Sequence, residues 1–181
     1  MLYWEAWEYE GTLIVHSGVV GDTGEVSYIP TSKAAQELVN RQAATLRSQG
    51  YAEIENEAHS VLLIQYPLDD IGSFEDLDKR HKVEKLMDEC LGWTGLGHCD
   101  GGDIGSGDMN VCCFVINPSS AVAPILQCLK ENDCLEGAAL VLETPSGLNV
   151  LWPLEREKAD LLHPVPDQQE VTASAQQCLQ L

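Results

Sequence analysis

The residues best suited to chemistry gather in one glycine-rich stretch, GWTGLGHCDGGDIGSGDMN, from Gly92 to Asn110. It lacks the Lys-Ser/Thr ending of a P-loop, and its aspartates would repel a phosphate. Five side chains offer the nitrogen, sulfur and oxygen donors that hold metal ions, namely His98, Cys99, Asp100, Asp103 and Asp108. Their spacing matches neither an EF-hand nor a paired C-x-x-C site. We therefore favour a compact structural turn, built with glycines at positive φ, over a metal site.

The residue types in this stretch also raise two enzymatic activities, a metal-dependent hydrolase and a thiol enzyme. The weak candidates for a metal site are His98, Cys99 and Asp103, which a metal-dependent hydrolase would need. A thiol enzyme would use Cys99 with His98, oriented by Asp100 or Asp103. However, the side chains of sequence neighbours usually diverge, and acidic surroundings disfavour a reactive thiolate. We therefore expect no catalytic residue and no cofactor, and we expect that the chain is not an enzyme.

Charge is the strongest global feature of the chain. Its 181 residues carry 29 acids against 10 Lys and Arg, a formal charge of −19, and no segment is basic. Nucleic-acid binding depends on Lys and Arg, so this composition argues against a nucleic-acid partner and favours a basic protein partner. Seven cysteines, an odd number, fit a reducing compartment better than a disulfide framework. Without a signal peptide or a long apolar run, we expect a cytoplasmic protein with no membrane contact.

The elements that must position these residues begin with a small sheet. Bulky aromatic residues predict an N-terminal strand, and a turn at Glu10-Gly11 leads into a β-rich run at 12–16. Trp4 and Trp7 lie on opposite faces of that strand, so one packs in a core and the other is freer. Helical spacing of apolar residues predicts a helix over 31–51, with Thr31 or Ser32 as its cap and Gly50 at its end.

The remaining chain predicts a second module and a tail. Strands are expected at 61–68, 109–116, 137–143 and 148–154, with helices at 73–93 and 118–132 and Ser73 as a cap. This order favours a sheet with helices packed against it, and we predict a ferredoxin-like α/β sandwich. The predicted fold class is α+β, with domains at 1–57 and 58–153 and a mobile tail at 154–181.

The first 54 or so residues resemble the WGR domain, which is named for a central Trp-Gly-Arg and occurs in poly(ADP-ribose) polymerases. The matching frame includes LYWEAWE, the hairpin into LIVHSGVVGDTGE, the two glycines Gly21 and Gly24, and the helix ending in RSQGYAEI. In that family the Trp and Arg help to engage DNA ends or breaks. Here Ser17 and Val19 take their places and only Gly18 is retained, so the resemblance implies the scaffold without its DNA function. The second module resembles a type found in small uncharacterised bacterial proteins, which implies no known activity.

These observations favour a non-enzymatic, cytosolic protein-binding module. The leading hypothesis is an acidic inhibitor, similar in logic to immunity proteins, that masks a basic partner such as a toxin or effector. The residues expected to bind the partner are Trp7, Asp100, Asp103 and Asp108. The alternative is a WGR-type, nucleic-acid-associated regulator, and a metal-dependent hydrolase using the acidic loop comes third.

Overall fold

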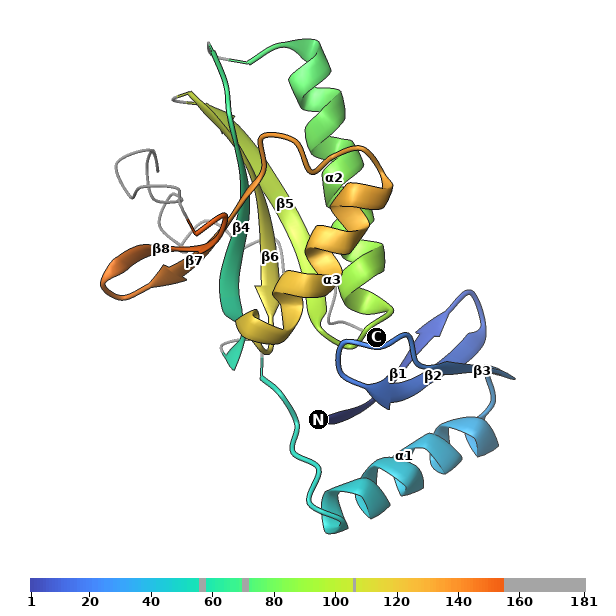
Figure 1. Cartoon of the computed structure of the whole chain (residues 1–181). Helices are drawn as coiled ribbons and strands as arrows, with labels where there is room; N and C mark the ends of the chain where they lie inside the picture. Colours follow the sequence, from blue (N-terminus) through green and yellow to red (C-terminus); the bar gives the residue numbers. More distant parts are fainter. Residues whose placement is uncertain (56–57, 70–71, 106, 155–181) are drawn as a thin grey trace.

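Two α+β modules follow one another along the chain. The computed structural model describes residues 1–55, 58–69, 72–105 and 107–154. A three-stranded antiparallel sheet with one helix is followed by a five-stranded antiparallel sheet with two helices (Figure 1). This confirms the predicted α+β class. Of the predicted tail at 154–181, everything from residue 155 on lies outside the described residues.

The first module is a meander closed by a tight hairpin. Its elements are β1 (Leu2–Tyr9), β2 (Thr12–Val19), β3 (Glu25–Pro30) and α1 (Lys33–Ser48). Glu10 and Gly11 both have positive φ, at 47° and 76°, which is the geometry of a two-residue type I′ turn. That turn fixes the β1–β2 register, with Tyr9 opposite Thr12 and Glu5 opposite His16. The side chain of Ser32 caps α1, as predicted.

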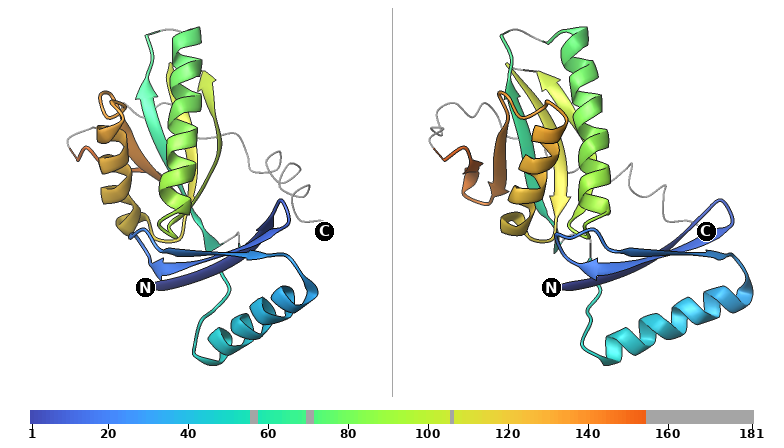
Figure 2. Two further views of the ribbon diagram at one scale, coloured as in Figure 1. Left: turned by 90° about the vertical axis from the view of Figure 1, so that its right-hand side faces the viewer. Right: turned by 45° about the vertical axis from the view of Figure 1, so that its right-hand side comes forward.

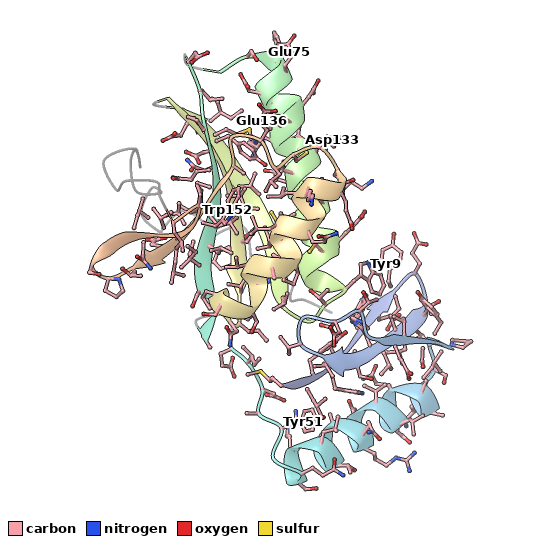
Figure 3. All side chains as sticks on the ribbon, in the orientation of Figure 1. Tyr9, Tyr51, Glu75, Asp133, Glu136 and Trp152 are labelled. Atoms are coloured by element: carbon pink, nitrogen blue, oxygen red, sulfur yellow. The ribbon has the colours of Figure 1, made fainter. Side chains whose placement is uncertain are left out.

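The two faces of the three-stranded sheet have different environments. Trp4, with Ala6, Val15 and Ile29 of the same face, packs against Leu13 and against Ala35 and Val39 of α1. The opposite face, which we call the aromatic face, carries Tyr3, Glu5, Trp7, Tyr9, Ile14, His16 and Tyr28. Figure 3 shows Tyr9 at the hairpin tip on the side away from α1. The predicted division between the two tryptophans is thus confirmed, because Trp4 packs under α1 and Trp7 is 40% exposed.

The second module has ferredoxin-like topology. Its elements are β4 (Ser60–Pro67), α2 (Phe74–Gly92), β5 (Gly97–Gly105), β6 (Asp108–Val115), α3 (Pro118–Glu131), β7 (Ala139–Thr144) and β8 (Gly147–Trp152). The sheet order β5-β6-β4-β7-β8 is the βαββαβ arrangement with β8 added as an edge strand. Both helices lie on one side of the sheet (Figure 2). The main core forms between them and residues such as Leu62, Ile64 and Val111.

The helix α2 connects the two modules. Ser73 and Asp76 form a capping box at its start, which confirms Ser73 as the cap. Its other end reaches the first module, where the Gly21 amide donates to the Thr94 carbonyl at 2.9 Å. The end of the ferredoxin-like module's longest helix is therefore anchored on the first module.

The glycine-rich stretch is largely a strand, and the prediction of a compact turn was wrong. Residues Gly97–Gly105 form β5, paired with β6. A Cβ on Gly97 would lie 1.9 Å from the Phe114 carbonyl oxygen, and one on Gly102 would lie 2.1 Å from that of Asn110. The glycines at these two positions therefore permit close approach of β6. Propensity alone misleads here because glycine is usually depleted in strands.

The described residues bear on membrane-spanning helices and on the state of the cysteines. No helix in the described ranges is long and apolar enough to cross a membrane. Six cysteines in these ranges are free thiols. Cys113 is buried on the helix side of β6, so its neighbour Cys112 points to the outer face of the five-stranded sheet.

Candidate functional site

A buried histidine lies where the two modules meet. His16 is 1% exposed, in the middle of β2 on the aromatic face. Its Nδ1 lies 2.7 Å from Oε1 of Glu5, which is its register partner on β1. Its Nε2 lies 2.7 Å from the hydroxyl oxygen of Tyr3. With the proton on Nδ1, His16 donates to the Glu5 carboxylate and accepts from the Tyr3 hydroxyl, so both ring nitrogens are satisfied.

Gly18 and Gly24 pack closely around Tyr3, the third residue of the His16 network. The Gly24 backbone hydrogen-bonds to Tyr3, and a Cβ on Gly24 would lie 2.1 Å from the Tyr3 hydroxyl oxygen. A Cβ on Gly18 would lie 2.9 Å from Cα of Gly24. Burial raises the pKa of Tyr3 above its usual value, the nearby Glu5 carboxylate adds to this, and the Gly24 bond opposes it. Gly18 and Gly24 are therefore explained by backbone packing around Tyr3.

Two tryptophans extend the network to the surface. The ring of Trp93, the residue that ends α2, lies 5.3 Å from the His16 ring in an edge-to-face arrangement. The ring of Trp7 lies 6.5 Å from the His16 ring, also edge to face. Both tryptophans are 40% exposed, and the Glu5 side chain is 46% exposed. A fixed histidine thus orients two aromatic surfaces beside a carboxylate that faces solvent.

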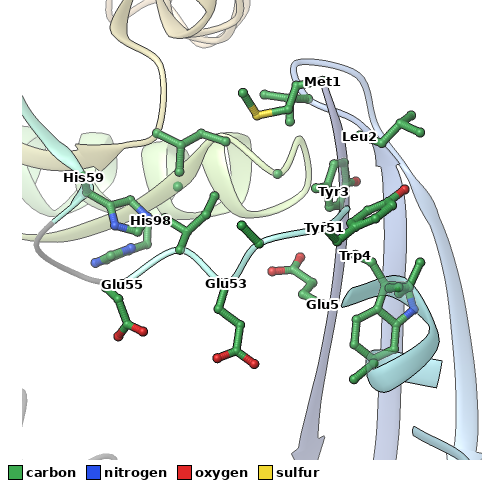
Figure 4. A pocket seen from close by; sticks show the side chains of 18 of the residues that line it. Met1, Leu2, Tyr3, Trp4, Glu5, Tyr51, Glu53, Glu55, His59 and His98 are labelled. Atoms are coloured by element: carbon green, nitrogen blue, oxygen red, sulfur yellow. The ribbon is translucent and has the colours of Figure 1, made fainter. Parts of the chain in front are cut away.

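A cleft of about 680 Å³ lies between the modules, next to the His16 network, and Tyr3 and Glu5 of that network line it. Its walls are the first five residues of the chain, the end of α1, the extended segment 51–55 and the start of β5. Figure 4 shows Glu5, Glu53 and Glu55 along it, with Trp4 and Tyr51 at one end and two histidines at the other. Among the described residues that line the cleft, Arg47 is the one Lys or Arg, and it is paired with Glu53. The cleft is therefore aromatic and acidic.

The two histidines of the cleft are His59 and His98. Their rings lie 5.7 Å apart, and the His98 ring stacks on Phe114 at 5.3 Å. Burial lowers the pKa of His98, and the neighbouring His59 lowers it further, against the effect of Asp100. His98 therefore holds its neutral form over a wider pH range than an exposed histidine does.

The predicted partner-binding aspartates lie on β5 and β6 of the second module, outside the His16 network. Asp100 and Asp103 are exposed on β5, whereas Asp108 is 2% exposed at the start of β6. Burial raises the pKa of the Cys112 thiol to about 12, and the carboxylates of Asp100 and Asp103 contribute to this shift. Both exposed aspartates thus act on the outer face of the five-stranded sheet. The structure presents Asp100 and Asp103 to solvent and keeps Asp108 inside.

The weak metal candidates are not gathered around one point. His98 stacks on Phe114, while Cys99 lies opposite Cys113 on the helix side of the sheet. Asp103 pairs with Asn110 beyond a bulge that follows Cys99. Within the ranges that the structure describes, no group of three or more His, Cys, Asp or Glu side chains could hold a metal ion.

The His16 network was missed from the sequence, although a signal for it existed. Once the turn is placed at Glu10-Gly11, a two-residue loop pairs residue 5 with residue 16 and residue 3 with residue 18. A carboxylate opposite a histidine, with a tyrosine two residues earlier, then follows from the register. The contribution of Trp93 comes from tertiary packing, for which the sequence has no local signal.

We compared the chain with protein-family models, curated proteins and solved structures, and none of them matches it. The resemblance to the WGR domain therefore stays a prediction.

Proposed function

We propose that this chain is a non-enzymatic protein-binding module that docks on a basic partner protein and masks it, in the manner of an inhibitor or immunity protein. One observation carries the proposal. Trp7 and Trp93 are both partly exposed and are held by the buried His16, next to the solvent-facing carboxylate of Glu5. Exposed tryptophans on a rigid support are characteristic of binding surfaces rather than of an ordinary solvated face.

The chemistry of this surface suits a cationic side chain. The face of an indole ring attracts Lys and Arg, and a nearby carboxylate supplies the opposite charge. Because His16 makes two hydrogen bonds and contacts both indole rings, the rings are already positioned before a partner arrives. Such preorganisation reduces the entropic cost of binding.

The electrostatics around Trp93 point to the same class of partner. The C-terminal end of a helix carries partial negative charge, and the last turn of α2 contains no basic residue. Asp88 and Glu89 lie within this last part of the helix. With a formal charge of −19 overall, the protein attracts a basic partner at long range, which speeds encounter. Asp100 and Asp103 extend the acidic surface over the second module.

The Glu5–His16–Tyr3 chain has the form of a catalytic triad, and we assign it a positioning role instead. In a triad the Tyr3 hydroxyl would be the nucleophile, and a nucleophile is activated by a lowered pKa. Burial, with the nearby Glu5 carboxylate, instead raises the pKa of Tyr3 and favours its protonated, less reactive form. The network instead fixes Tyr3 and the two tryptophans at the junction between modules.

Recovery of the partner from the cells that make the protein tests this proposal. Tagged wild-type chain is compared with a Trp7→Ser/Trp93→Ser double variant at low and high salt, and bound material is identified by mass spectrometry. We expect one basic protein to copurify in stoichiometric amount with the wild type, to be released at high salt and to be lost with the double variant.

The matched control is Phe74→Ser. Phe74 is 86% exposed at the opposite end of α2, so its replacement removes an exposed aromatic ring without touching the junction. This variant should retain the partner. Equal recovery with the double variant would contradict the proposal, and stoichiometric recovery of nucleic acid would favour the WGR-type alternative.

A further inference from the structure

Among the residues that the structure describes, strand β1 pairs with β2 on one side only, so it forms a free edge of the three-stranded sheet. In a two-residue hairpin the residues flanking the turn, Tyr9 and Thr12, bond to each other, so the odd-numbered residues of β1 bond to β2. The backbone groups of the even-numbered residues therefore point outward, namely those of Leu2, Trp4, Ala6 and Glu8. Within the part of the chain that the structure describes, none of these outward groups makes a backbone hydrogen bond.

This edge lacks several of the features that usually prevent a strand from being added, and the charges that it carries are the glutamates Glu5 and Glu8. Its eight residues pair with β2 in unbroken register, without a bulge. The strand contains neither proline nor lysine. Proteins normally protect an edge of this length with a bulge, a proline, a lysine or a covering element. The free edge of β1 is thus a template for another strand.

The surroundings of the edge select the charge of that strand. The cleft of about 680 Å³ opens beside the first half of β1, and Glu5, Glu53 and Glu55 line it together with Arg47 (Figure 4). Glu5 and Glu8 lie on the strand itself. These carboxylates disfavour an acidic strand and favour a basic one. A second copy of this chain would bring the same glutamates together and add another charge of −19, so it fits poorly.

We propose that the partner contributes an extended basic segment, which adds to the free edge of β1 as a further strand. This inference rests on the proposed function and specifies how the partner is held. Main-chain hydrogen bonds to Trp4, Ala6 and Glu8 supply affinity, and side chains at alternate positions supply specificity. Alternation places every second side chain on the aromatic face, beside Trp7 and Glu5. The segment therefore carries Lys or Arg at every second position.

A synthetic peptide of alternating lysine and valine, as long as β1, tests this inference on the full chain by calorimetry. The matched probe is the same peptide with alternate backbone amides N-methylated, which keeps the charge and removes the strand-forming donors. We expect the unmodified peptide to bind and the methylated peptide to bind at least about tenfold more weakly, because several main-chain hydrogen bonds are lost.

A pair of protein variants tests the same contact from the other side. Glu8→Pro removes an outward amide from an exposed edge position where proline is tolerated, whereas Glu8→Gln removes only the charge. We expect Glu8→Pro to bind the unmodified peptide about fivefold more weakly than Glu8→Gln does, the effect of one lost hydrogen bond. Circular dichroism confirms that both variants are folded.

The outcomes separate this inference from the proposed function. Equal binding of the two peptides would overturn strand addition, yet it would leave attraction of a basic partner in place. No binding of either peptide would also overturn strand addition. A dimer of the chain that is lost with Glu8→Pro would overturn the basic occupant, because the edge would then take a second copy of this chain. Failure of the proposed function would show instead as undiminished partner recovery by the Trp7→Ser/Trp93→Ser variant.

Discussion

Strands β1 and β5 are both edge strands of antiparallel sheets, and their edges differ in chemistry. β5 has a bulge between Cys99 and Gly102, exposes Asp100 and Asp103, and offers its Gly102 carbonyl to the Arg80 guanidinium at 2.7 Å. β1 has an unbroken register and outward groups that make no backbone hydrogen bond among the described residues. An acidic surface alone therefore does not identify a binding edge. What distinguishes β1 is the combination of acidic side chains, an exposed tryptophan and a backbone edge in regular register without a bulge.

The largest expected effect comes from disturbing the pairing of β5, the protected edge strand, with β6. In Gly102→Ala, the new Cβ would lie 2.1 Å from the Asn110 carbonyl oxygen, so β5 must move away from β6. We expect a loss of about 2–3 kcal/mol in the free energy of unfolding, measured by urea denaturation. Gly105→Ala is the control, because nothing lies within 4 Å of its Cβ and the stability should change little. Equal stability of the two variants would show that glycine is not required for the close pairing of β5.

The next largest effect concerns the His16 network, which bonds to Tyr3 and Glu5 of β1. His16→Phe keeps a ring between Trp7 and Trp93 but removes the hydrogen bonds to Glu5 and Tyr3. We expect a loss of about 2 kcal/mol in the free energy of unfolding, because the part-buried Tyr3 hydroxyl loses its side-chain partner. Tyr28→Phe, at an exposed position of the same face, should leave stability unchanged. Wild-type stability of His16→Phe would contradict the positioning role of the network.

The sequence predicted much of the fold and little of the site, for physical reasons. Helix α1 and its Ser32 cap, helix α2 and its Ser73 cap, and the α+β order depend on local periodicity and capping, which the chain states directly. Strand β5 was missed because its glycines meet a demand for close approach that only β6 imposes. Asp108 was expected on a surface but lies inside, since burial depends on tertiary packing. Strand alternation alone predicted that Trp4 and Trp7 lie on opposite faces, and the packing of α1 decides that Trp7 is the exposed one.

A smaller effect is expected where α2 protects β5. Arg80→Met removes the donor to the Gly102 carbonyl and the ion pair with Glu84. The loss should be about 1 kcal/mol or less in the free energy of unfolding, with faster amide exchange in β5. Lys85→Met, which breaks only the exposed pair with Glu89, should have almost no effect. Exchange in β5 that is unchanged by Arg80→Met would mean that the bulge alone protects this edge.

The smallest effect is a pH dependence at the start of β1. Burial, with Glu5, raises the pKa of Tyr3 above its usual value of 10.0. A tyrosine whose pKa is raised in the folded state contributes stability that is present at lower pH and lost as the pH rises above about 10. In Tyr3→Phe, the free energy of unfolding should therefore fall less steeply than in the wild type as the pH rises above about 10. An identical alkaline slope in the variant would show that Tyr3 titrates as it does in the unfolded chain.

Amide hydrogen exchange, resolved residue by residue by NMR, tests the central claim most directly. In the free protein we expect the outward amides of Trp4, Ala6 and Glu8 to exchange faster than the inward amides of Glu5 and Trp7. Addition of the alternating lysine–valine peptide should slow exchange at these three outward amides and shift the indole signals of Trp7 and Trp93. Protection on β5 instead, or no protection anywhere on β1, would contradict the account.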